Sequence, residues 1–404
     1  MFVGGEVEGQ CWKPTSALRL RSPSGSLRSA QHNKTMEQNK PQIRPFAVIL
    51  KAIILIALCN FAFIFLKGIP LGKISLYNSV FPGRERLPFG EHPQAYNLSL
   101  FNLDAMFASH ILTGKPKAAN EYRVFLIGDS SIWGTLLTPE QTLAGQLNSG
   151  ALSACGRIVR AYNLGYPYIS LMQELMILDE ALQYQPDMVI WLTTLESLPR
   201  DKQFGSPLVA NNAERVRQLI AKYELNADPN DQALVNASKW DQTFVSRRRE
   251  LSDLMRLQMY GALWASTGID QFYTESYERA QIDLEASDEF HNLTSLQNTL
   301  AMDVLDAGMT AAPVPTILVN EPILISNGLN SDIRYNFFYP RWAYDEYRVL
   351  LNEYATERGL PYLDLWDLVP LNEFTNSGVH LTPAGEAMLT DKIAEAIQSN
   401  CNNK

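Results

Sequence analysis

Ser130 is the residue whose surroundings in this sequence most clearly favour covalent chemistry. It ends the tripeptide Gly128-Asp129-Ser130, which follows an apolar run over residues 122–127 that is typical of a buried strand. A serine just past the C-terminal end of a strand lies where open α/β sheets place their ligand sites. Its hydroxyl is a weak nucleophile at neutral pH, so it needs a neighbouring base and donors for a developing oxyanion.

A histidine could supply the base, and the chain has five histidines. Four of them lie in the N-terminal tail, in the region before the first expected strand or in a later insertion: His32, His92, His110 and His291. His380 instead lies in a turn directly before a helix and after the last expected strand, where it could return to the tip of the first strand. We therefore pair Ser130 as nucleophile with His380 as base.

Alternating strands and helices are expected to position this pair. Short apolar runs bounded by turn residues predict strands at residues 123–127, 158–163, 188–192, 315–319 and 362–365. Helices are expected over 98–112, over 171–184 behind the cap Ser170, and from Thr382-Pro383 onward. This alternation predicts a parallel sheet with helices on both faces, and residues 211–300 are expected to be mostly helical.

The predicted organisation has four parts. Residues 1–45 form a disordered cytoplasmic tail, 46–66 a transmembrane anchor, 67–120 a juxtamembrane connector, and 121–400 one domain with a helical insertion at about 200–310. Within the tail, Met36 begins a short lead-in to the anchor, so we expect it to be the true start. N-terminal sequencing of the native protein tests that expectation.

The apolar run at 46–66 is long enough to cross a bilayer. Lys51 lies near its start and could extend to the interface, whereas Asn60 would prefer a polar partner, such as another transmembrane helix. No small-residue cleavage pattern follows, so an uncleaved anchor is predicted; the alternative is a buried core helix. The short preceding tail favours a single-pass protein of the plasma (inner) membrane with an extracytoplasmic body.

Charge and cysteine usage exclude some function classes. The first 45 residues carry seven Lys or Arg against three acidic residues, yet the chain has a net charge of −9, so its body is acidic and does not favour nucleic acid. The four cysteines form no CxxC pair, and we expect no metal and no cofactor. The sequence leaves open whether Cys155 and Cys401 meet.

Two blocks of the sequence resemble the SGNH/GDSL hydrolase superfamily of esterases, lipases, carbohydrate deacetylases and acyl-transfer relatives. The segment from Gly128 to Gly134 is similar to its first block and places Ser130 as nucleophile; the segment from His380 to Gly385 is similar to its last block and places His380 as base. The resemblance spans about residues 121–400. It implies a three-layer α/β/α fold with a parallel, flavodoxin-like five-stranded sheet.

The sequence departs from the family pattern at the acid of the triad. The family's acid lies three residues before the histidine, where this chain has Ser377, preceded by Asn376. Either side chain could orient the imidazole, but neither stabilises an imidazolium as a carboxylate does. Nearby acids could substitute, namely Glu373, Asp364 or Asp367; otherwise a Ser–His dyad remains. Asp129 is expected to order the nucleophile loop.

The oxyanion donors depart from the family pattern as well. Residues 163–168 resemble the second block and offer the N–H of Gly165 or Tyr168, whereas the third block lacks its usual Asn and offers the Thr194 hydroxyl. An ordinary strand end is the competing interpretation of Thr194.

Two further clusters are candidates for a substrate wall. Asn320 and Glu321 directly follow the fourth expected strand, and residues 334–344 are unusually aromatic, with Arg334 and Arg341 placed to hold an anionic group. The alternative for the aromatic segment is a long loop packed over the edge of the sheet.

These features predict a membrane-anchored serine esterase or O-acyltransferase acting on acyl, above all acetyl, esters of an envelope polysaccharide or glycolipid. A single anchor joined to such a body resembles the accessory proteins that work beside multi-pass O-acyltransferases, which makes such an enzyme a candidate partner. The alternative is a catalytically weak module of the same fold that binds an envelope glycan or a membrane acyltransferase.

Overall fold

The computed structural model of the chain describes residues 44–65, 71–73, 75–89, 101–236, 238–267, 277–280, 290 and 293–402. The predictions for the tail before residue 44, including a start at Met36, lie outside the described residues. The chain divides into two units, Met1–Leu55 and Ile56–Lys404.

Helix α1 (Pro45–Phe65) covers the predicted anchor. In the part of the chain that the structure describes, it is the one helix that is long and apolar enough to cross a membrane. Its Asn60 is buried, and the Oδ1 atom accepts a hydrogen bond of 2.9 Å from the backbone N–H of Val245. The polar partner that Asn60 needs is therefore supplied within the chain.

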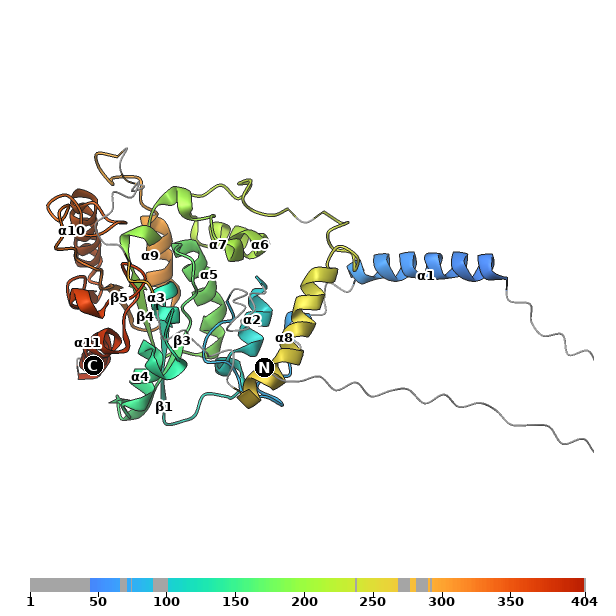
Figure 1. The fold of residues 1–404 in the computed structure, drawn as a ribbon, viewed down its shortest axis with the longest axis horizontal. Helices are drawn as coiled ribbons and strands as arrows, with labels where there is room; N and C mark the ends of the chain where they lie inside the picture. The colour runs from blue at the N-terminus through green and yellow to red at the C-terminus, as the bar shows by residue number, and fades with distance from the viewer. Residues whose placement is uncertain are drawn as a thin grey trace, which may run out of the picture. The chain divides into compact units, whose positions relative to one another are not determined.

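The body contains the predicted sheet (Figure 1). Its five parallel strands follow the expected ranges closely: β1 (Glu121–Ile127), β3 (Arg157–Asn163), β4 (Met188–Thr193), β5 (Thr316–Asn320) and β6 (Tyr362–Asp364). The order β2-β3-β1-β4-β5-β6 contains the flavodoxin-like arrangement of five parallel strands, so the predicted fold class is confirmed. The sequence missed the two-residue edge strand β2 (Ser153–Ala154), which pairs antiparallel with β3.

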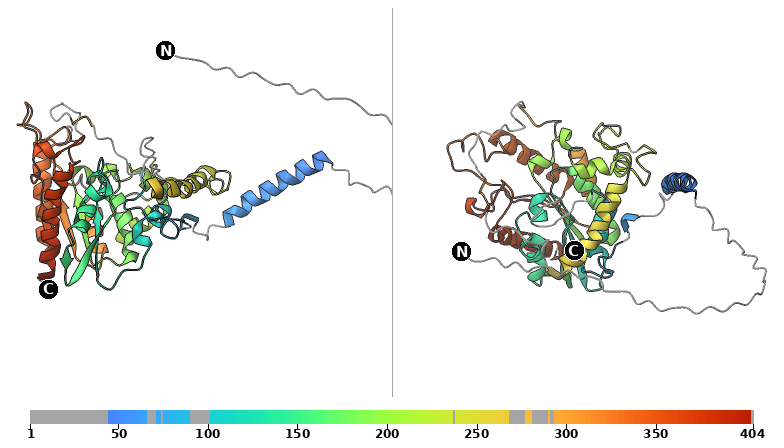
Figure 2. Two further views of the ribbon diagram at one scale, coloured as in Figure 1. Left: turned by 60° about the horizontal axis from the view of Figure 1, so that its bottom comes forward. Right: turned by 45° about the vertical axis from the view of Figure 1, so that its right-hand side comes forward.

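Helices cover both faces of the sheet, which is the middle of three layers (Figure 1 and Figure 2). Side chains of β1 alternate between two apolar cores, one on each face. Phe125 and Ile127 pack with α5 and α9 on one face, whereas Val124 and Leu126 pack with α4 and α11 on the other. The helices of the body, in chain order, are α2 (Leu103–Ser109), α3 (Ser130–Trp133), α4 (Leu143–Ser149), α5 (Leu171–Ala181), α6 (Pro207–Asn211), α7 (Ala213–Tyr223), α8 (Arg248–Thr267), α9 (Met302–Ala311), α10 (Arg341–Arg358) and α11 (Pro383–Asn402).

Two expectations for helices need correction. The described part of the helix expected over 98–112 is shorter, because Asn102 caps α2 and His110 ends it before a 3₁₀ turn. Residues 224–236 and 238–247 contain turns rather than helix. Asn, Asp and Pro favour turns in the first segment, and Ser238 and Asp241, which hydrogen-bond to each other, favour one in the second.

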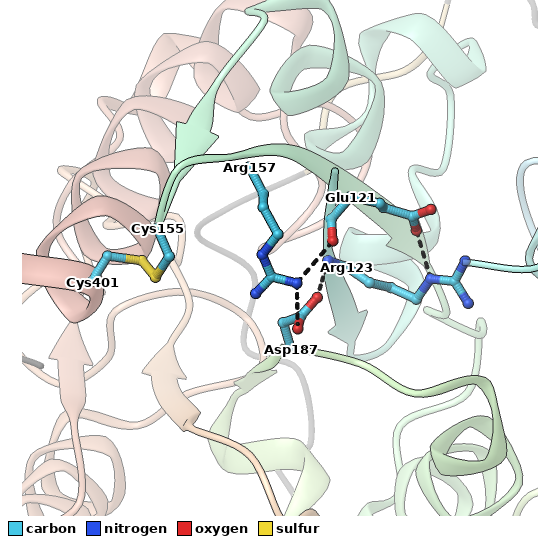
Figure 3. The surroundings of a disulfide bond; sticks show 6 residues. All are labelled: Glu121, Arg123, Cys155, Arg157, Asp187 and Cys401. Atoms are coloured by element: carbon cyan, nitrogen blue, oxygen red, sulfur yellow. Dashed lines mark hydrogen bonds and ion pairs between the residues drawn. A yellow bond between two sulfur atoms is a disulfide. The ribbon is translucent and has the colours of Figure 1, made fainter. Parts of the chain in front are cut away.

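A disulfide joins Cys155 to Cys401 across 246 residues of sequence, which settles the pairing that the sequence left open. Figure 3 shows it between the turn that follows β2 and the last turn of α11. Nearby, Asp187 accepts from the Arg157 guanidinium at 3.0 Å and from the Arg123 backbone N–H at 2.7 Å. The bond therefore fastens the last helix to the edge of the sheet.

Replacing both bonded cysteines, Cys155→Ser with Cys401→Ser, is expected to lower the free energy of unfolding by roughly 2–4 kcal/mol, because the unfolded chain loses a long cross-link. Denaturant unfolding under non-oxidising and oxidising conditions measures the change. The control is Cys59→Ser, which removes the free thiol of α1. Equal stability of the double variant and the wild type would show that the bond is not formed.

Candidate active site

Ser130 lies at the first position of α3, directly beyond the end of β1. The Asp129 carboxylate caps this helix, because its Oδ1 accepts from the Ser131 backbone N–H at 2.8 Å. Gly134 ends the helix with a φ of +84°, a left-handed conformation that favours glycine, and donates to the carbonyls of Ser130 and Ser131. Asp129 and Gly134 thus limit α3 to a single helical turn, and Ser130 is its first residue.

The segment after β3 packs directly against α3. A Cβ atom on Gly165 would lie 2.4 Å from the backbone nitrogen of Trp133, so this position requires glycine. The Asn163 Nδ2 donates to the Ile132 carbonyl at 2.6 Å, and its Oδ1 accepts from the Gly165 N–H at 3.1 Å. These contacts fix the position of α3 against the segment that follows β3.

The connector supplies support that the sequence did not reveal. Arg86 is buried, and its Nη1 donates to the carbonyls of Trp133, Gly134 and Leu137 at 3.0–3.3 Å, at the C-terminal end of α3. Its guanidinium also lies 4.3 Å from the centre of the Trp133 ring. The available signal was a basic residue beside prolines in an otherwise unpatterned segment, which is too weak to place it.

His380 is presented by a loop closed at both ends. Phe374 and Leu381 form a β-bridge, and Thr375 donates to the His380 carbonyl through its backbone N–H at 2.8 Å and its hydroxyl at 3.1 Å. The Gly378 carbonyl accepts from the Leu324 N–H at 2.7 Å, which ties the loop to the chain that follows β5. The histidine backbone is therefore fixed before α11 begins.

The two predicted residues meet. His380 Nε2 lies 2.8 Å from Ser130 Oγ, and His380 Nδ1 lies 2.8 Å from the Oδ1 of Asn376. Because an amide oxygen only accepts, Nδ1 carries the proton and Nε2 is left to accept the serine proton. The arrangement is a Ser–His–Asn series with the tautomer required of a general base.

The environment of His380 favours its neutral form. Burial lowers the pKa of its imidazole from the ordinary value of 6.5 to about 4, because the imidazolium loses hydration. Two of the three acids considered as substitutes bind elsewhere: Asp364 binds Arg348 and Asn320, and Glu373 accepts from the Thr382 hydroxyl. The neutral Asn376, rather than Ser377 or a carboxylate, holds the ring.

A group of buried carboxyls lies beneath the nucleophile helix. The Ser131 hydroxyl donates to Glu321 at 2.5 Å, and the Trp191 indole donates to Glu174 at 2.5 Å. Burial raises the pKa of Glu174 and Glu321 well above the ordinary value, and that of Glu386 to about 8. Burial also raises the pKa of Asp129. Burial therefore shifts each of these four carboxyls toward its protonated form.

The candidate oxyanion donors already have partners. The Gly165 N–H donates to Asn163, and the Tyr168 N–H donates to the Tyr166 carbonyl at 2.8 Å. The Thr194 hydroxyl lies 2.9 Å from the Tyr339 hydroxyl, and both side chains are buried. The oxyanion roles of Gly165 and Thr194 stay predictions.

The residues expected in a substrate wall lie mostly inside the body. Asn320 is buried and binds the hydroxyls of Tyr344 and Tyr347, so it orders the end of β5 instead of facing a substrate. Glu321 is buried against Ser131, as described above.

The aromatic segment supports the interpretation of a packed loop. Tyr335, Tyr339 and Tyr344 are buried, and the Tyr339 and Tyr344 rings lie 5.0 Å apart. Arg334 is also buried, and the Arg341 guanidinium stacks on Tyr335 at 4.3 Å. Neither arginine is displayed as an open anion site.

Among the residues that the structure describes, no group of three or more His, Cys, Asp or Glu side chains is arranged to hold a metal ion. The chemistry available to the described site is that of a hydroxyl activated by a neutral imidazole.

No protein-family model and no curated protein matches the chain. Among solved structures, the chain is similar to a carbohydrate acetylesterase family member from Sinorhizobium meliloti, with 12% identity over 68% of this chain and 96% of that one and a TM-score of 0.30. It is also similar to an aryl esterase of M. smegmatis, with 13% identity over 69% of this chain and 98% of that one and a TM-score of 0.32.

Asn376→Asp is expected to raise kcat/KM for an activated ester roughly tenfold or more, because a carboxylate stabilises the imidazolium that forms in the transition state. The same charge raises the pKa of His380, which in the wild type is about 4. Since the base must be neutral, the acid limb of the pH–rate profile moves to higher pH in the variant.

Hydrolysis of p-nitrophenyl acetate across the pH range measures both effects. Ser377→Ala is the matched control, because this neighbour does not hold the ring, and its profile should match the wild type. An unchanged acid limb in Asn376→Asp would contradict the assigned contact.

Proposed function

We propose that this protein is a serine ester-cleaving enzyme in which Ser130 is the nucleophile and His380 the general base. The observation that carries the proposal is the hydrogen-bonded series from Ser130 Oγ through the imidazole to Asn376 Oδ1. Catalytic serines require a base within about 2.6–3.2 Å and a third group that orients it, and both conditions are met.

In the proposed reaction, Ser130 Oγ attacks the ester carbonyl while its proton passes to Nε2 of His380. The tetrahedral intermediate collapses, and the imidazolium returns the proton to the leaving alcohol, which leaves an acyl group on Ser130. Water or a second hydroxyl then attacks the acyl-enzyme and gives its proton to His380. The bond between the acyl carbon and Ser130 Oγ breaks, and the imidazolium returns the proton to the serine. With water the enzyme is an esterase; with a sugar hydroxyl it is an O-acyltransferase.

Two features support an extracytoplasmic, membrane-anchored body. Helix α1 has the length and composition of a membrane span. The disulfide between Cys155 and Cys401 suits an oxidising compartment, because cytosolic proteins rarely keep such bonds. These features support the proposal that a single helix holds the protein in the plasma (inner) membrane.

We infer that the substrate is an acyl, above all acetyl, ester of an envelope polysaccharide or glycolipid. The inference rests on the resemblance of the two sequence blocks and on an anchor that would hold the site near the membrane. A multi-pass O-acyltransferase is the proposed partner where the acyl group is transferred rather than released.

A second candidate is a catalytically weak module that binds an envelope glycan or a membrane acyltransferase. The neutral Asn376, which orients the imidazole where a carboxylate would be expected, favours it, as do the partners already held by Gly165 and Thr194. The formed contact between Ser130 and His380 favours the enzyme.

A fluorophosphonate probe distinguishes the two functions, because it reacts with activated serines. We expect the wild type to be labelled, Ser130→Ala to lose all labelling and His380→Ala to lose nearly all. Ser131→Ala is the matched control and should keep its label, since this serine binds Glu321 instead of the imidazole. An unlabelled wild type would favour the binding module.

A further inference from the structure

Helix α8 packs against the connector through one side. Leu257 and Trp264 are buried with Tyr77 and with Ala105 of α2. The Gln258 side chain accepts a hydrogen bond of 2.7 Å from the Leu76 backbone N–H. Figure 1 shows α8 beside α2. This side of the helix is therefore an ordinary part of the body.

The opposite side of α8 is apolar and exposed. Met255, Met259 and Leu263 follow each other at a spacing of four residues, with 65%, 72% and 44% of their surfaces exposed. Phe244 and Val245, in the turn before the helix, are 51% and 40% exposed. We name these five residues the α8 face. A run of large apolar side chains on one helix face needs an occupant.

The α8 face is joined to the end of the apolar helix α1. Asn60 of α1 accepts from the Val245 N–H at 2.9 Å, and the Phe63 and Phe244 rings lie 5.6 Å apart. These residues all belong to the unit Ile56–Lys404. Because Asn60 precedes the last residue of α1, Phe65, by five positions, the contact lies about 7.5 Å back along the helix axis.

That depth favours lipid as the occupant at the start of the α8 face. If α1 crosses a bilayer, a contact about 7.5 Å inside its end brings Phe244 and Val245 to the boundary between headgroups and acyl chains, where amphipathic helices bury their apolar faces by about 5–10 Å. Arg248 and Arg249, exposed at the start of α8, carry the charge that anionic headgroups attract. A protein partner would require no such depth match.

We propose that the α8 face lies in the membrane interface beside α1 and rests the catalytic body on the lipid surface. The proposal depends on the proposed membrane anchoring and adds a second lipid contact to it. Two separate attachments fix the orientation of the body, so Ser130 is held at a set height above the lipid instead of moving freely on a tether.

The test uses the full chain in vesicles that contain anionic lipid and a lipid-borne quencher. A fluorophore is attached at Met259→Cys in a Cys59→Ser background, where the bonded Cys155 and Cys401 do not react. Val349→Cys is the matched control, because Val349 is 55% exposed on α10, on the other side of the body from α8 in Figure 1. Native Cys59, labelled in the otherwise unchanged chain, reports on α1 itself.

We expect quenching at position 259 comparable with that at Cys59, and none at position 349. Quenching at Cys59 with none at 259 would overturn the proposed contact between the α8 face and lipid, but not the anchor. It would indicate that the α8 face binds a protein instead. No quenching at Cys59 would contradict the anchor, whatever position 259 shows. Leu263→Cys repeats the measurement one turn further along should the first variant fold poorly.

Discussion

The hydrogen bond between Ser130 and His380 joins two loops that are 250 residues apart in the sequence. The serine follows a central strand, β1, whereas the histidine follows the edge strand β6, so the sheet alone does not bring them together. The histidine loop reaches inward through the contact between Leu324 and Gly378, and α11 then packs beside α4. Packing across much of the body therefore sets the distance of 2.8 Å between Ser130 Oγ and His380 Nε2.

The neutral form of the His380 imidazole follows from its surroundings. A buried imidazole with a pKa of about 4, oriented by an amide, stays a neutral base over most of the accessible pH range. Burial also raises the pKa of Glu174 and Glu321, the carboxyls next to α3. Such a site offers little support to an imidazolium, which limits its rate.

The sequence predicted the parts that depend on local pattern. We could identify the five parallel strands from their apolar runs, and the serine and histidine turns from the residues that bound those runs. Both signals lie within a few residues of the element that they predict. Sequence did not reveal the support from Arg86, because its partners are backbone carbonyls distant in the chain. The burial of Asn320 was missed for a similar reason, since its position at a strand end says nothing of the tyrosines that α10 adds above it.

The central claim is that Ser130 carries the acyl group, and peptide mass mapping of a rapidly quenched reaction with p-nitrophenyl acetate tests it most directly. We expect an acetyl group on the peptide that contains Ser130, and its accumulation in the wild type but not in Ser130→Ala. Ester turnover with the acetyl group on another residue, or with equal labelling of Ser130→Ala, would contradict it.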